Sequence, residues 1–145
     1  MAFLAGETIT AGRLNRLQPK LYHATGTGLD IGALQDDVDV PGLSIPVSVG
    51  TAGATYQATI AVSFYNISPS GAVGSARLYL DNLGVGVFGV YADADNSGKA
   101  TVVQTYQGTI STAGSHTFKV VATTPGGQTI KTTFSTFSLI VSEIA

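Results

Sequence analysis

The chain contains no cysteine and no tryptophan, and only 11% of its 145 residues are charged. Without cysteine there is no disulfide framework, no thiolate metal site and no cysteine nucleophile. Ordinary soluble domains carry about 25% charged residues, so serine, threonine and glycine supply most of the polarity here. Such a surface is either rich in hydroxyl groups or hidden by other subunits.

Long hydrophobic runs and a basic surface are missing as well. No apolar stretch approaches the roughly 20 residues that a membrane-spanning helix needs, and no secretory signal is evident at the N-terminus. The net charge is −2, which leaves no basic footprint for a nucleic acid. We therefore expect a protein made in the cytoplasm that has no membrane span and no nucleic-acid partner.

Catalytic motifs are also absent. The chain has two histidines, His23 and His116, but no recognisable nucleophile elbow. Asp93 and Asp95 are the nearest approach to a glycosidase pair, yet one short loop holds carboxylates poorly for opposed roles. We predict no enzymatic activity, no catalytic residue and no cofactor, and we expect His116 to be exposed or to lie at an interface.

Two acidic segments resemble cation sites without completing one. The stretch "DADNSG" at 93–98 imitates the start of a calcium loop, but its twelfth position is Gln104 where a bidentate glutamate is needed. Asp36, Asp37 and Asp39 are close together and also suit an edge strand on which charge prevents unwanted pairing. No metal site is predicted, and the sequence leaves cation binding open at both segments.

The stretch "GVGVFG" at 84–89 matches a dinucleotide fingerprint letter for letter. That chemistry requires a helix after the glycines and an acidic residue about twenty positions later, and neither is present. We interpret this segment as a buried strand covered on both faces, whose glycines allow another backbone to approach closely. Among the aromatic residues, Tyr65, Tyr91 and Tyr106 are the candidates for a platform on which a sugar stacks.

One short helix is predicted over residues 8–18. Thr8 or Thr10 is a suitable N-cap, Leu14 and Leu17 share a face, and Pro19 ends the helix. Such a short helix is marginal alone in water and must dock on something.

From residue 21 onward the sequence alternates as β-strands do. In "ATYQATIAVSFYN" at 54–66 every second residue is apolar, and similar runs recur between turn signals such as "SPSG" and "TPGG". Regular spacing of this kind indicates an all-β, antiparallel jelly-roll-like β-sandwich. We predict an N-terminal arm at 1–20 and a knob domain at 21–145.

The opening "FLAGETITAGRLNRLQP" resembles the N-terminal arms of small virion proteins from tailed phages. The segments at 37–65 and 106–124 resemble phage fibre and decoration knobs, the second being similar to the penultimate hairpin of the tumour-necrosis-factor or C1q-like jelly roll. The positions that match the arm pattern are Phe3, Ala5, Gly6, Ile9, Thr10, Ala11, Leu14 and Asn15.

This resemblance implies a homotrimeric virion structural protein of the minor tail or fibre type, or of the capsid decoration or head-fibre type. It would be made in the host cytoplasm and assembled on the phage particle. Its arm would contact other virion proteins or its own copies, with the two arginines meeting an acidic partner surface. The residues expected in this anchor are Phe3, Ile9, Arg13, Leu14, Arg16 and Leu17. The alternative is a carbohydrate-binding β-sandwich module that recognises host surface glycans.

Overall fold

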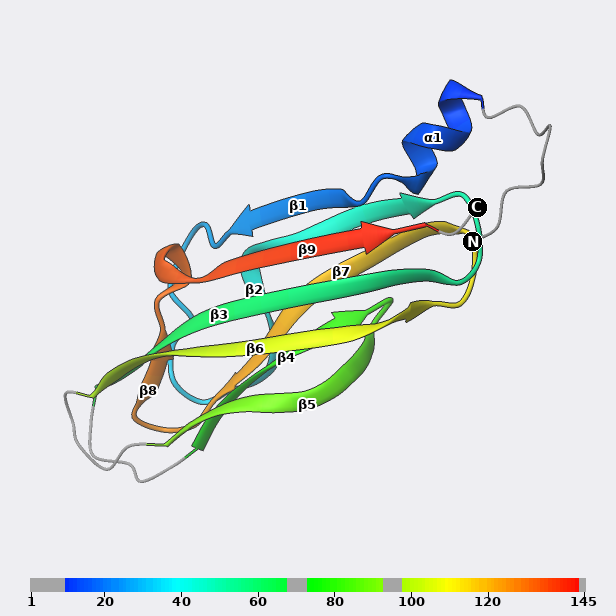
Figure 1. The fold of residues 1–145 in the computed structure, drawn as a ribbon. Helices are drawn as coiled ribbons and strands as arrows, with labels where there is room; N and C mark the ends of the chain where they lie inside the picture. Colours follow the sequence, from blue (N-terminus) through cyan, green and yellow to red (C-terminus); the bar gives the residue numbers. More distant parts are fainter. Residues whose placement is uncertain (1–9, 68–72, 93–97, 144–145) are drawn as a thin grey trace.

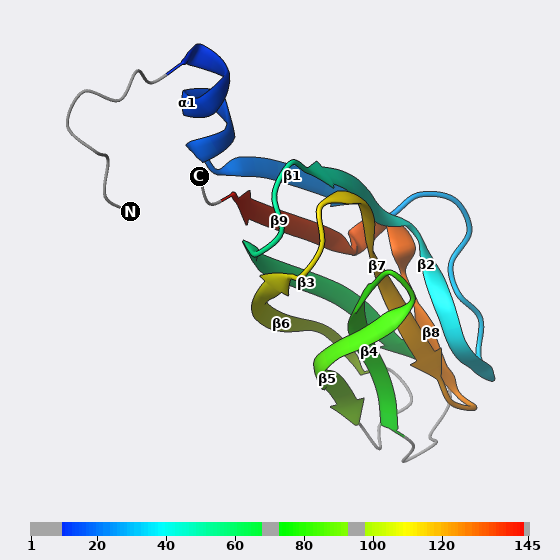
Figure 2. The same cartoon turned by 90° about the vertical axis from the view of Figure 1, so that its right-hand side faces the viewer.

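The chain folds into two antiparallel sheets that pack face to face (Figures 1 and 2). The computed structural model describes residues 10–67, 73–92 and 98–143. The helical elements are α1 (Ala11–Leu17) and the 3₁₀ turn η1 (Thr132–Phe134). The strands are β1 (Lys20–Thr25), β2 (Gln35–Val49), β3 (Ala54–Asn66), β4 (Val73–Leu80), β5 (Leu83–Ala92), β6 (Lys99–Ile110), β7 (Gly114–Thr124), β8 (Gln128–Ile130) and β9 (Thr136–Ser142).

Each sheet combines strands from distant parts of the sequence. Sheet A has the order β1-β9-β3-β6, with β8 also pairing with β3, and sheet B has the order β2-β7-β4-β5. The chain therefore passes repeatedly between the two layers, and most strand pairs are non-local. This arrangement confirms the predicted all-β, jelly-roll-like sandwich.

The core forms where the inward faces of the two sheets meet. Along β3 the predicted alternation is confirmed, with Tyr56, Ala58, Ile60, Val62 and Phe64 all buried. The largest fully buried side chains are Phe64, Phe118 and Phe137, which come from three different strands. The ring of Tyr56 meets that of Phe118 edge to face at 4.9 Å between centroids, a favoured geometry for aromatic pairs.

Helix α1 is shorter than the predicted span, although its cap is confirmed. The side chain of Thr10 accepts a hydrogen bond from the backbone amide of Arg13 at 3.3 Å. Gln18 is extended, as expected for a residue that precedes a proline. The helix buries none of its residues and projects beyond the sandwich (Figure 1). Within the described ranges, no helix has the length and apolar character needed to cross a bilayer.

A buried carboxylate ties the base of this helix to the sandwich. Glu143, whose side chain is 2% exposed, accepts hydrogen bonds from Lys20 Nζ at 2.7 Å and from the Gly50 amide at 2.8 Å. Burial alone would raise the pKa of Glu143, but these two bonds and the charges of Lys20 and Arg16 hold it below its usual value. The beginning of β1, the β2–β3 turn and the end of β9 are joined at this point.

Strand β5 departs from the prediction of a strand covered on both faces. It lies at the edge of sheet B, where Val87, Phe88 and Val90 are 66%, 47% and 59% exposed. Its glycines admit side chains rather than another backbone, because a Cβ on Gly89 would lie 2.6 Å from Val102 Cγ1. Sequence alternation could not reveal this, since an edge strand and a central strand can carry the same apolar residues.

His116 is buried, which corrects the expectation of an exposed or interface imidazole. It is 8% exposed and points inward in the same alternation as Phe118 and Val120. Its ring nitrogens bond to Asp81 in the turn between β4 and β5 and to the Thr112 carbonyl. Asp81 lies 35 residues away in the sequence, so the local pattern could not predict this pair.

Candidate functional site

A hollow of 280 Å³ lies on the outer face of sheet A, at the end opposite α1 (Figure 1). Two successive cross-strand pairs of β3 and β6 form its floor, Tyr65 with Lys99 and Ser63 with Thr101. Phe134 of η1 forms a wall. Because facing residues of an antiparallel pair project on the same side of a sheet, the register of β3 and β6 brings these side chains together.

Two aromatic rings form a shelf in this hollow. The rings of Tyr65 and Phe134 are stacked, with centroids 6.5 Å apart and planes inclined by 26°. Phe134 is 62% exposed, so much of its ring surface remains open. Two ammonium groups flank the Tyr65 ring, Lys99 Nζ at 5.0 Å and Lys131 Nζ at 5.7 Å from its centroid, within the range of cation–π attraction.

Backbone and hydroxyl contacts hold η1 rigidly on β3. The Lys131 amide donates to the Ser63 carbonyl at 2.9 Å, and the Ser63 amide donates to Ser135 Oγ at 3.1 Å. Ser63 Oγ donates to the Phe134 carbonyl, also at 3.1 Å. The exposed ring of Phe134 is therefore carried by a backbone that is fixed on both sides.

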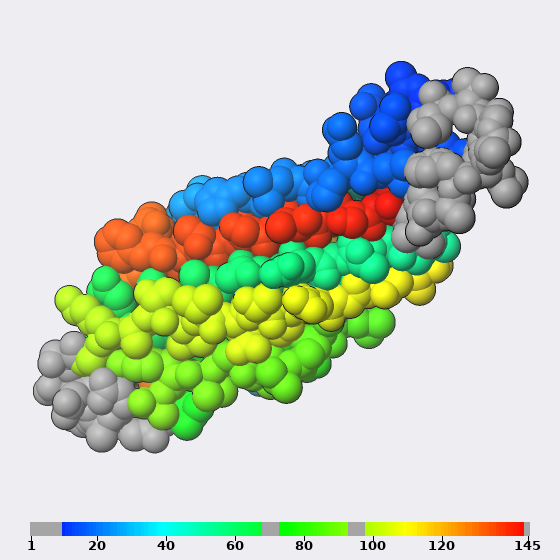
Figure 3. Space-filling model, viewed as in Figure 1, coloured from blue at the N-terminus to red at the C-terminus, as the bar shows by residue number. Residues whose placement is uncertain are grey.

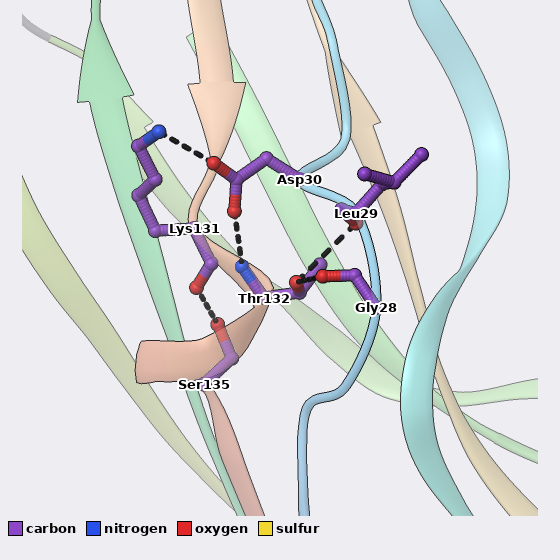
Figure 4. Close-up of polar contacts among 6 residues, drawn as sticks. All are labelled: Gly28, Leu29, Asp30, Lys131, Thr132 and Ser135. Carbon is purple, nitrogen blue, oxygen red and sulfur yellow. Dashed lines mark hydrogen bonds and ion pairs between the residues drawn. The ribbon is translucent and has the colours of Figure 1, made fainter.

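A second network connects η1 to the segment that follows β1 (Figure 4). Asp30 forms an ion pair with Lys131 Nζ and accepts the Thr132 amide at 3.2 Å. The Thr132 hydroxyl lies 3.3 Å and 3.4 Å from the carbonyl oxygens of Leu29 and Gly28. Lys131 is thus neutralised by a carboxylate of its own chain.

Lys99 differs from Lys131 in this respect. In the described ranges, Lys99 forms no ion pair with a carboxylate, and its side chain is exposed. Among the described residues, the shelf is therefore bordered by Lys131, which has a carboxylate partner, and Lys99, which has none.

Only one of the three tyrosines predicted for a sugar platform lies at this surface. Tyr65 is half-buried in the hollow, whereas Tyr91 and Tyr106 are 8% and 4% exposed and belong to the core. The Tyr106 hydroxyl donates to the Val87 carbonyl at 3.0 Å, and burial raises the pKa of this phenol.

Sequence reasoning missed Phe134, Lys99 and Lys131. One signal was present, because Phe134 stands three positions before the buried Phe137 and so has the opposite parity to the core residues of β9. The position of Lys99 opposite Tyr65 depends on strand register, which the sequence does not show.

The predicted anchor residues lie at the other end of the molecule. Leu14 on α1 is 49% exposed, and Leu17 is half-buried. Arg16 lies near Glu143, since a Cβ on Gly50 would stand 3.1 Å from Glu143 Oε2 and 3.5 Å from Arg16 Cδ. Arg13 lies in the first turn of α1, where its backbone amide donates to Thr10 Oγ1. Phe3 and Ile9 lie outside the described residues.

The acidic segments show no assembled cation site in the part of the chain that the structure describes, where no three acidic or histidine side chains are grouped for a metal. Asp39 is paired with Lys119 at 2.9 Å, and Asp36 accepts the Thr123 hydroxyl at 3.1 Å. Both lie with Asp37 on the edge strand β2. Asp93 and Asp95 lie outside the described residues.

The outer face of sheet A forms a second candidate surface (Figure 3). Between the hollow and α1 it carries no aspartate, glutamate, lysine or arginine on the described strands. A larger hollow of 480 Å³ near α1 is lined mainly by hydroxyl and amide side chains together with Ile140. The outward residues of this face are Leu21, His23, Thr25, Thr55, Gln57, Thr59, Ala61, Thr101, Val103, Thr105, Gln107, Thr109, Thr136, Ser138, Ile140 and Ser142.

No protein-family model and no curated protein sequence matches the chain. Among solved structures it is similar to Eiger TNF from S. frugiperda, with a TM-score of 0.56 and 11% identity over 86% of this chain and 92% of that one. The CBM36-1 domain of a multidomain xylanase from the hindgut metagenome of Trinervitermes trinervoides has a TM-score of 0.44 and 11% identity, over 88% of this chain and 99% of that one. A chain from the structure of infectious bursal disease virus Gt strain has a TM-score of 0.44 and 13% identity, over 88% of this chain and 38% of that one. The fold and its strand order define a β-sandwich of the jelly-roll class, and the similarity to Eiger TNF supports that class.

Proposed function

We propose that this chain is a homotrimeric structural protein of a bacteriophage virion, attached to the particle by its N-terminal arm. The minor tail or fibre type and the capsid decoration or head-fibre type are both forms of this proposal. The observation that carries it is the part of the outer face of sheet A between the hollow and α1, which has no charged side chain on the described strands and lies next to the apolar edge at β5.

The uncharged face is suited to burial by another subunit. Removing charged side chains from water costs several kcal/mol for each ion. Between the hollow and α1, the described strands of this face carry no aspartate, glutamate, lysine or arginine. Leu21 and Ile140 form a cross-strand pair on it and are 75% and 37% exposed. The outer face of sheet B carries the Asp39–Lys119 ion pair and is a poorer interface.

The exposed edge strand β5 provides the second surface for the proposed contact between subunits, and it differs in shape from the face of sheet A. Val87, Phe88 and Val90 stand out along β5, which packs against β6 of the opposite sheet. A contact between two unlike surfaces is heterologous, and it closes into a ring when the rotation allows. The ring size of three follows from the resemblance to trimeric knobs of jelly-roll type.

The arm supports attachment at one end of the unit. Helix α1 stands beyond the sandwich with Leu14 exposed, at the end where β9 finishes (Figure 1). A helix this short needs a partner surface to be stable. A neighbouring virion protein or the other two copies would provide it.

The mass of the protein in solution tests the trimer. Light scattering coupled to size exclusion should give three times the 14.8 kDa of one chain. Ile140→Lys, which places a charge on the uncharged face, should shift the protein toward monomer. Ser48→Lys adds the same charge to the exposed outer face of sheet B and should leave the trimer intact. A wild-type monomer at all concentrations would refute the trimer.

Incorporation into particles tests the virion assignment. Deleting residues 1–18 removes α1 but keeps Lys20 for Glu143, so the sandwich should fold normally. Particles assembled with this variant should lack the protein, as judged by mass spectrometry of purified virions. Incorporation at the wild-type level would show that the arm is not the anchor.

A carbohydrate-binding module is the second candidate function. It is favoured by the shelf of Tyr65 and Phe134, which offers an exposed aromatic ring beside hydroxyl groups. Binding of an oligosaccharide by the isolated protein would support it.

A further inference from the structure

We propose that the hollow formed by Tyr65, Lys99 and Phe134 binds an acidic sugar, a pyranose that carries a carboxylate. This inference rests on the second candidate function and specifies its ligand. The hollow lies at the end opposite α1 (Figure 1), so a subunit fastened by its arm would present it outward.

The aromatic shelf explains why the ligand has a ring. Phe134 is 62% exposed, and a pyranose has an apolar face of C–H groups that can cover it. The volume of 280 Å³ lies near the lower limit of about 300 Å³ for ligand pockets. A single sugar residue is therefore an appropriate size.

Lys99 explains why the ligand is an anion. Its ammonium group is exposed, has no carboxylate partner in the described ranges and lies 5.0 Å from the Tyr65 ring centroid. Lys131 cannot serve equally well because Asp30 already pairs with it. A carboxylate on the ligand would form an ion pair with the ammonium group of Lys99.

The hydroxyl groups of the floor have fixed roles. Ser63 Oγ donates its proton to the Phe134 carbonyl, and Thr101 Oγ1 lies 2.9 Å from it. Thr101 must therefore donate to Ser63, because the Ser63 proton is already engaged. The lone pairs of Thr101 are left to accept a hydroxyl of the sugar.

The site is held in place before any ligand arrives. Ser63 is 4% exposed and fixes η1 through three hydrogen bonds. Little conformational entropy is lost when a preformed site binds. The arrangement can thus bind a small ligand that offers few contacts.

Calorimetry on the full chain tests this inference with galacturonate and its neutral counterpart, galactose. The acidic sugar should bind, the neutral one should bind about tenfold more weakly, and Lys99→Gln should remove that preference. Phe134→Ala should weaken both by about tenfold or more, whereas Phe134→Tyr should retain binding. Lys119→Gln, which removes a lysine from sheet B, is the matched control and should change nothing.

The outcomes separate this inference from the function on which it rests. Equal binding of both sugars that depends on Phe134 would leave the carbohydrate-binding function standing and overturn the acidic ligand. Binding of neither sugar would overturn both. Binding unaffected by Lys99→Gln and Phe134→Ala would overturn the site.

Discussion

His116 Nδ1 lies 2.6 Å from Asp81 Oδ2, and the other ring nitrogen lies 3.0 Å from the Thr112 carbonyl oxygen. A carbonyl oxygen and an ionised carboxylate can each only accept a hydrogen bond, because neither carries a proton. Both ring nitrogens therefore carry protons, and the imidazole is held as its cation. Asp81 also accepts the Thr117 amide at 2.8 Å, so the pair fastens the β4–β5 turn to β7.

This pair makes the stability of the protein depend on pH. The hydrogen bond that His116 donates to Asp81 is the main cause that raises the pKa of His116 above 6.5, and burial opposes it more weakly. A raised pKa gives stability that is complete below about pH 6.5 and is lost as the pH rises through the folded-state pKa. We expect a loss of about 1–2 kcal/mol, because Asp81 is 46% exposed and water screens the pair.

Denaturant unfolding between pH 5 and pH 9 checks this expectation. The free energy of unfolding of the wild type should fall across that interval, and that of His116→Gln should fall less. Both proteins keep every other titratable residue, so the difference between the two curves isolates His116. Parallel curves would show that His116 is not the titrating group.

Asp81 gives the stability of the protein the opposite dependence on pH, because its contribution is lost as the pH falls. Burial favours a higher pKa for Asp81, but the hydrogen bonds from His116 and Thr117 outweigh it and lower the pKa. Its contribution is present above about pH 3.9 and disappears as the pH falls through the lowered value.

Lys20→Met should destabilise the protein through Glu143. It leaves a carboxylate that is 2% exposed without its ammonium partner, and we expect a cost of about 2–3 kcal/mol. The exposure of Lys20, 38%, keeps this below the cost for a fully buried pair. The deficit should shrink near pH 4, because a protonated Glu143 needs no counter-charge. Denaturation midpoints at pH 7 and pH 4 measure both effects.

Lys119→Met is the matched control for that experiment. It breaks the pair with Asp39, whose side chain is 62% exposed, and exposed pairs contribute up to about 1 kcal/mol. Equal losses for the two lysine variants would contradict the structural role assigned to Glu143.

Gly26→Ala should loosen the segment that carries the aromatic shelf. A Cβ at Gly26 would stand far inside contact distance of the Thr132 carbonyl oxygen, so η1 must move away from β1. We expect a loss of about 1–3 kcal/mol and changed chemical shifts at Phe134. Gly12→Ala on α1 meets nothing within 4 Å and should raise helicity without lowering the melting temperature. Unchanged stability of Gly26→Ala would contradict the close contact.

Leu14→Asp should reduce assembly without affecting folding. The side chain is exposed on a helix that buries none of its residues, so the sandwich does not depend on it. Binding to particles should fall toward the level of the deletion of residues 1–18, with an unchanged melting temperature. Asn15→Asp adds the same charge to another exposed position of α1 and should matter less. Equal effects would indicate that charge alone, and not the Leu14 side chain, is responsible.

The sequence predicted the fold better than the site. The alternation at 54–66 predicted the bounds of β3 and five of its buried residues, because a period of two is a local property of a strand. The Thr10 cap and the break before Pro19 were local as well. The exposure of β5 and the burial of His116 were missed, since both depend on which strand lies next to which.

The aromatic shelf illustrates the same limit. Tyr65 was recognised as a candidate, but nothing near it in the sequence points to Lys99, which stands opposite it only through the register of β3 and β6. Phe134 approaches from η1 because two serines and Asp30 fix that turn.

The sequence by itself determined a chain of alternating strands with few charges, no cysteine and a short capped helix at its start, because these features are composition and local periodicity. The tertiary structure alone decided that the outer face of sheet A has no charged side chain on the described strands between the hollow and α1. It also decided that β5 exposes apolar residues at an edge, and that Tyr65, Lys99 and Phe134 share one hollow. Those properties arise when residues far apart in the chain are brought together by non-local strand pairing.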